Sequence, residues 1–69
     1  MVEVFKTNVQ NHSDAERLAS ELSKKSNSLK INFDLNDCDN ILRVEAQKIN
    51  PLEIIELMHS NGFQCEVIL

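Results

Sequence analysis

The sequence has no tryptophan, no tyrosine and only three phenylalanines in 69 residues. This scarcity argues against a surface that stacks bases or sugar rings on aromatic side chains. The chain has one glycine and one proline, and we find no linker, repeat or low-complexity tract. A chain of this size buries only about 60% of its unfolded surface, which leaves little core for a deep catalytic cavity. We therefore expect one domain over residues 1–69, and no enzyme.

Long apolar runs and an excess of basic residues are also missing. No segment approaches the roughly 20 apolar residues that span a bilayer, and a net charge of −4 disfavours nucleic acid as a partner. Residues 1–9 have neither the basic start nor the apolar core of a signal peptide. The expected location is the cytoplasm, where Cys38 and Cys65 would be free thiols.

Alternation and capping residues outline the first half of the chain. Residues 2–9 form a strand, but two sets of apolar positions, 2 and 4 or 5, 7 and 9, compete for the core, and a bulge would accommodate both. Ser13 followed by Glu16 is typical of a capping box. It precedes a helix whose apolar face is Ala15, Leu18, Ala19 and Leu22.

The second half repeats this order after a clear strand over residues 29–35, in which apolar and polar residues alternate. A turn at 37–40 and a strand over 42–47 follow. Asn50 and Pro51 begin a second helix, and Gly62 is its expected left-handed stop. Ile54, Ile55 and Met58 supply the apolar stripe of that helix, and a last strand occupies residues 64–69.

This β-α-β-β-α-β order predicts an α+β, ferredoxin-like fold. Its simplest form is a four-stranded antiparallel sheet of order 4-1-3-2, with both helices on one face. Cys38 and Cys65 would then lie about 12 Å apart, because strands are spaced by about 4.8 Å. A disulfide needs Cα atoms within about 7 Å, so we expect none.

The layout resembles the heavy-metal-associated domain of copper chaperones and metal-pumping ATPases over essentially the whole chain. The similarity is strongest where the second helix runs into Asn61-Gly62-Phe63 and then Gln64-Cys65-Glu66-Val67. The family signature is Met-x-Cys-x-x-Cys at the first strand–helix junction. Aligned through Leu18 and Leu22, this chain has Val9 at the methionine position and Asn11 and Asp14 at the two cysteine positions.

Loss of both thiolates argues against the family's metal transfer, because Cu(I) prefers sulfur to the oxygens of Asn and Asp. Two other families of this shape fit less well. RNA-binding domains carry aromatic residues on the central strand, where this chain has Arg43, Glu45 and Gln47. Acylphosphatases need an arginine in a glycine-rich first loop, and the loop here has neither.

In the expected topology, the first loop, the 37–40 turn and the end of the second helix meet at one end of the domain. This end is acidic, whereas the lysines gather at the opposite end (Lys24, Lys25, Lys30 and Lys48). A mixed divalent-metal site there would draw its ligands from His12, Asp14, Asp37, Cys38 and Asp39, with His59 and Cys65 nearby. Ordinary turn and capping roles explain the same residues without any ligand.

Two hypotheses about function follow. The first is a non-enzymatic binding or adaptor module, without a cofactor, which meets a protein partner through its acidic end or its open sheet face. The alternative is metal handling by the non-standard ligands at the loop end. The chain is expected to be a monomer, or a weak dimer through its C-terminal edge strand, where Ile68 faces outwards and Glu66 is the one charged guard.

Overall fold

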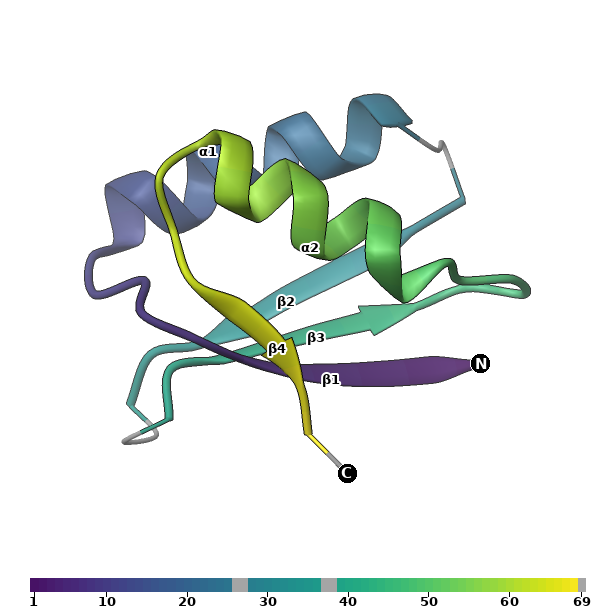
Figure 1. Cartoon of the computed structure of the whole chain (residues 1–69), viewed down its shortest axis with the longest axis horizontal. Helices are drawn as coiled ribbons and strands as arrows, with labels where there is room; N and C mark the ends of the chain where they lie inside the picture. The colour runs from purple at the N-terminus through teal and green to yellow at the C-terminus, as the bar shows by residue number, and fades with distance from the viewer. Residues whose placement is uncertain (26–27, 37–38, 69) are drawn as a thin grey trace.

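A computed structural model describes residues 1–25, 28–36 and 39–68. The elements follow in the order β1 (Val2–Thr7), α1 (His12–Lys25), β2 (Lys30–Asp34), β3 (Ile41–Glu45), α2 (Pro51–Ser60) and β4 (Cys65–Val67). The strands form one antiparallel sheet of order β2-β3-β1-β4. This is the expected order 4-1-3-2 read from the opposite edge, so the α+β fold class is confirmed. Both helices lie on the same face of the sheet (Figure 1).

Register decides which face of β1 is buried. Phe5 lies opposite Leu42 on β3 and Val67 on β4, and it is fully buried together with Val9. Val2 is exposed, so the odd-numbered set faces the core. The pairing of β1 with β3 runs residue for residue from 2 to 6, without a bulge.

The core lies between the sheet and the two helices. α1 packs over β2 and buries three of its four predicted residues, Ala15, Leu18 and Leu22, whereas Ala19 is only partly buried. α2 packs over β4 and buries Ile54, Leu57 and Met58. The predicted stripe of α2 therefore needs one correction: Leu57 is buried, whereas Ile55 is only partly buried. The apolar residues of the second strand, Leu29, Ile31, Phe33 and Leu35, are packed against this core.

The start of α1 differs from the expected one. Ser13 lies inside the helix rather than capping it, and Asn11 takes the capping position. The Asn11 side-chain oxygen accepts the N–H of Asp14 at 2.8 Å, and the N–H of Ala15 donates to the Asn11 carbonyl at 3.1 Å. Asn, Ser and Asp are all good N-cap residues. Asn11, Ser13 and Asp14 could therefore each begin the helix, and the sequence alone does not distinguish them.

The ends of α2 form as predicted. The Asn50 side chain accepts the N–H of Leu52, and Pro51 opens the helix. Gly62 has φ +88°. The N–H of Gly62 donates to His59, and that of Phe63 donates to Met58. These two bonds make a Schellman motif, which stops α2 and turns the chain toward β4.

Candidate functional site

The first loop and the 39–40 turn lie together at one end of the sheet, as expected, and hydrogen bonds join them. Thr7, a buried polar residue, donates its hydroxyl to the Asn40 carbonyl at 2.6 Å and accepts the N–H of Val9 at 3.2 Å. The N–H of Thr7 donates to the Asp39 carbonyl at 3.2 Å. Asn40 has φ +50°, a conformation that Asn tolerates better than most residues. Thr7 therefore fixes the geometry of this end.

The two residues at the expected cysteine positions bind each other. Besides the capping bond, the Asn11 side-chain amide donates to Asp14 Oδ2 at 2.9 Å. Asp14 Oδ1 lies 3.6 Å from Nη2 of Arg17. Both carboxylate oxygens of Asp14 thus already have partners, and neither residue offers the soft sulfur that Cu(I) prefers. These residues do not fit the metal of the family that the sequence resembles.

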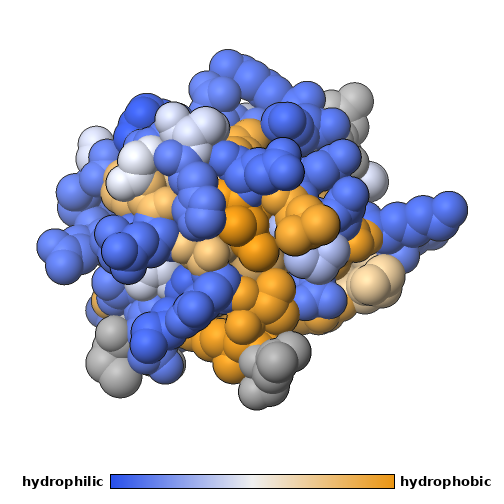
Figure 2. All heavy atoms as spheres, viewed as in Figure 1, coloured by the Kyte–Doolittle hydropathy of each residue, from blue (hydrophilic) through white to orange (hydrophobic). Residues whose placement is uncertain are grey.

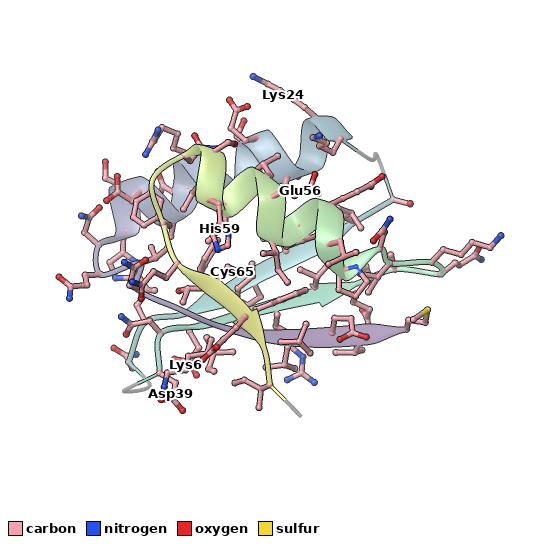
Figure 3. The ribbon with its side chains drawn as sticks, in the orientation of Figure 1. Lys6, Lys24, Asp39, Glu56, His59 and Cys65 are labelled. Carbon is pink, nitrogen blue, oxygen red and sulfur yellow. The ribbon has the colours of Figure 1, made fainter. Side chains whose placement is uncertain are left out.

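The remaining expected ligands do not gather around Asp14. His12 is exposed at the first position of α1, and His59 lies in the last turn of α2. Asp39 pairs with Lys6, with 3.9 Å between Oδ1 and Nζ, and Figure 3 shows the two side by side. Asp37 and Cys38 lie outside the described residues. Among those that are described, no three His, Cys, Asp or Glu side chains could hold one metal ion.

Sequence reasoning missed the two cations of this end. Lys6 and Arg17 each pair with an aspartate, so the expected acidic character is partly neutralised. The i,i+3 spacing of Asp14 and Arg17 could have indicated one of these pairs. The pairing of Lys6 with Asp39 depends on the sheet register, which the sequence leaves undecided.

Cys65 starts β4 with its side chain in the core. Its thiol is free, and burial, with a smaller contribution from Glu66, raises its pKa from the ordinary value of 9.0 to about 12. A recess of about 360 Å³ lies beside it, lined also by Thr7, His59 and Gln64. His59 points from α2 toward the start of β4 (Figure 3). The thiol nevertheless stays protonated at neutral pH, and a protonated thiol is a poor nucleophile and metal ligand.

Neither helix of the described residues covers the other face of the sheet (Figure 1). The exposed polar side chains of this face include Lys6 on β1, Glu66 on β4, and Lys30, Asn32, Asp34, Arg43 and Glu45 on β2 and β3. Arg43 is central, opposite Val4 on β1 and Asn32 on β2, and Lys30 pairs with Glu45 at 3.9 Å. Two exposed apolar residues lie beside these polar groups: Val2 on β1, which is 44% exposed, and Ile68 just after β4, which is 41% exposed.

Neither helix in the described part of the chain is long and apolar enough to cross a bilayer. No protein-family model, curated protein or solved structure matches this chain.

Proposed function

We propose that this chain is a small non-enzymatic binding or adaptor module, with a heavy-metal-associated shape that has lost its thiolate metal site. The observation that carries this proposal is the pairing of Asn11 with Asp14. At the junction where the resembled family holds its metal, the polar atoms of these residues are used to cap α1. The junction therefore serves to stabilise the fold, and a binding function requires another surface.

The open sheet face is the better of the two candidate surfaces for a protein partner. At the acidic end, Asp14 and Asp39 are engaged by Arg17 and Lys6, which reduces the charge available to a partner. The open face combines a polar centre around Arg43 with the exposed apolar Val2 and Ile68. An apolar area beside polar and charged groups is the usual composition of a transient protein interface.

Crosslinking and pull-down with Arg43→Glu test this proposal. Lys24→Glu is the matched control, because it makes the same charge change on α1, in the layer that covers the other face. Wild type and Lys24→Glu should capture the same specific protein, and Arg43→Glu should lose it. If Arg43→Glu still captures the partner, the interface does not lie on the open sheet face. A small metabolite that co-purifies in the absence of any protein partner would contradict the adaptor function.

Metal handling is the alternative function, and a titration separates it from the adaptor function. Reduced protein is titrated with Zn(II) and then with Cu(I) while amide chemical shifts are followed. An adaptor predicts that segments 11–14 and 37–40 stay unshifted at equimolar metal. A metal protein that uses His12, Asp14, Asp37, Cys38 and Asp39 predicts saturable shifts in both segments.

A further inference from the structure

A cavity of about 300 Å³ opens between the end of α1 and the start of α2. The end of α1 and the start of α2 lie at the end of the domain opposite the first loop, on the right in Figure 1. The volume of the cavity is about ten times the roughly 30 Å³ that one water molecule occupies in the liquid. It falls at the lower limit of the range typical of small-molecule sites and suits a ligand of about ten non-hydrogen atoms.

Four aliphatic side chains line this cavity. Leu22 of α1 and Ile54 of α2 belong to the buried core, and Leu29 and Ile49 are partly buried against it. The four come from separate segments, so the cavity exists only in the folded chain. Because these walls offer no hydrogen bonds, they favour a hydrocarbon or aromatic body over a sugar or a phosphate.

The charged groups of the lining are Lys25, Lys48 and Glu53. Two lysines and one glutamate leave one net positive charge. The other lysines of this end are engaged away from the cavity: Lys24 pairs with Glu21 at 3.5 Å and Lys30 with Glu45 at 3.9 Å. The cavity therefore joins an apolar interior to a rim that favours a single negative charge.

The first turn of α2 does not supply the anion contact. The N–H of Leu52 donates to the Asn50 side chain at 3.1 Å, and that of Glu53 donates to the Asn50 carbonyl at 3.2 Å. Pro51 has no N–H to give. Of the groups in the lining, the ammonium groups of Lys25 and Lys48 carry the positive charge that attracts an anion, and the side-chain amide of Asn50 is a neutral donor beside them.

We propose that this cavity binds a small amphiphile with one carboxylate, the apolar body between α1 and α2 and the carboxylate between Lys25 and Lys48. The site lies on the side of the sheet that the helices cover and is separate from the open sheet face, so this inference goes beyond the adaptor function. Glu53 sets the charge selectivity, because it opposes a second negative charge on the ligand.

Titration with octanoate, which has about the number of non-hydrogen atoms that the volume allows, tests the proposal. Amide shifts are followed on the full chain, with octan-1-ol and octylamine as neutral and cationic probes of the same length. Octanoate should give saturable shifts confined to residues 22–25, 29 and 48–54, and the other two probes should bind more weakly. Absence of saturable shifts, or equal binding of all three probes, would overturn the assignment.

Charge variants test the roles of the rim residues. Lys25→Gln and Lys48→Gln should each weaken octanoate binding by up to about fivefold, the upper range for an exposed ion pair. Glu53→Gln should strengthen it, by about twofold. Lys24→Gln is the matched control: it removes the same charge one residue away and outside the lining, and should leave binding within error. Equal weakening by Lys24→Gln and Lys25→Gln would reduce the effect to net charge and refute the site.

Discussion

Asn11 and Asp14 form two hydrogen bonds with each other across the first turn of α1, with distances of 2.8 Å and 2.9 Å. Both are polar residues, and the alignment expected from the sequence with the heavy-metal-associated domain would place thiolates at these two positions. The spacing of three residues serves either purpose, because positions i and i+3 of a helical turn lie on the same side. In this chain the spacing closes a helix cap.

Restoring sulfur ligands at positions 11 and 14 should create a Cu(I) site. The double variant Asn11→Cys with Asp14→Cys should bind Cu(I) with one equivalent, because two thiolates at this spacing supply the soft ligands that the metal prefers. Competition with a chromogenic Cu(I) chelator measures the affinity, and the two single variants are the controls. Loss of the cap should cost about 1 kcal/mol of unfolding free energy. A double variant that competes no better than the singles would show that the alignment with the family is wrong.

Thr7 provides the second prediction. Thr7→Val keeps the shape of the side chain but leaves the Asn40 carbonyl and the buried N–H of Val9 without the bonds that the hydroxyl makes. Unfolding free energy should fall by about 1–3 kcal/mol, the cost of unpaired buried polar groups. Thr7→Ser, which keeps the hydroxyl and loses one methyl, should be less destabilised. Chemical denaturation measures both variants, and the opposite ranking would mean that the methyl contact matters more than the hydrogen bonds.

The third prediction concerns the end of α2. A Cβ built on Gly62 meets nothing within 4 Å, so Gly62→Ala carries backbone strain at φ +88° without a steric clash. The expected cost is about 1 kcal/mol of unfolding free energy. Gly62→Asn should cost less, because Asn enters the left-handed region more readily. Thermal or denaturant unfolding of the two variants compares them, and a neutral Gly62→Ala would contradict the strain argument.

The fold was predictable wherever one physical signal was unambiguous. Residues 29–35 alternate without exception, and Gly62 is the single glycine of the chain, so the strand and the stop of α2 follow directly. The face of β1 was undecided because Val2 and Phe5 are both apolar, and only pairing with Leu42 and Val67 resolves it. The last strand is shorter than expected, β4 ending at Val67.

The candidate sites were less predictable, because they depend on contacts between distant segments. Residue type and a shared end of the fold are the two signals that predict the metal ligands. The partners that engage Asp14 and Asp39 are set by a helix cap and by sheet register. The cavity lies between Leu22 of α1 and Ile54 of α2, which β2 and β3 separate in the sequence. No local sequence pattern predicts a cavity formed by such distant residues.

Cys65 gives a prediction about pH. Its pKa is raised in the folded chain to about 12 from an ordinary 9.0, so folding favours the protonated thiol. The stabilisation is complete below pH 9 and is lost as the pH rises toward 12, because the unfolded chain releases the proton first. Wild type should lose up to about 1.4 kcal/mol of unfolding free energy per pH unit in this window relative to Cys65→Ala. If the unfolding free energies of the two proteins depend on pH in the same way, burial does not raise the pKa of the Cys65 thiol.

Self-association provides the last prediction. β2 and β4 are the edges of the sheet. The β2 edge carries the charged residues Lys30 and Asp34, whereas the β4 edge has Glu66 between the apolar residues Cys65, Val67 and Ile68. Figure 2 shows apolar surface along α2 and over the C-terminal end of β4. The N–H of Ile68 still donates to the Val4 carbonyl at 2.9 Å, so the chain stays extended beyond β4.

Because an extended edge with few charges is a template for another strand, we expect any dimer to form through β4. Ile68→Lys should then abolish the rise in sedimentation coefficient with concentration. Leu52→Lys is the matched control: Leu52 is 67% exposed on α2, against 41% for Ile68, so general surface stickiness would make Leu52→Lys the stronger variant. Association that survives Ile68→Lys, or intermolecular contacts that map to residues 29–35, would place the interface elsewhere. A wild type that stays monomeric at millimolar concentration would show that Glu66 alone is sufficient to guard this edge.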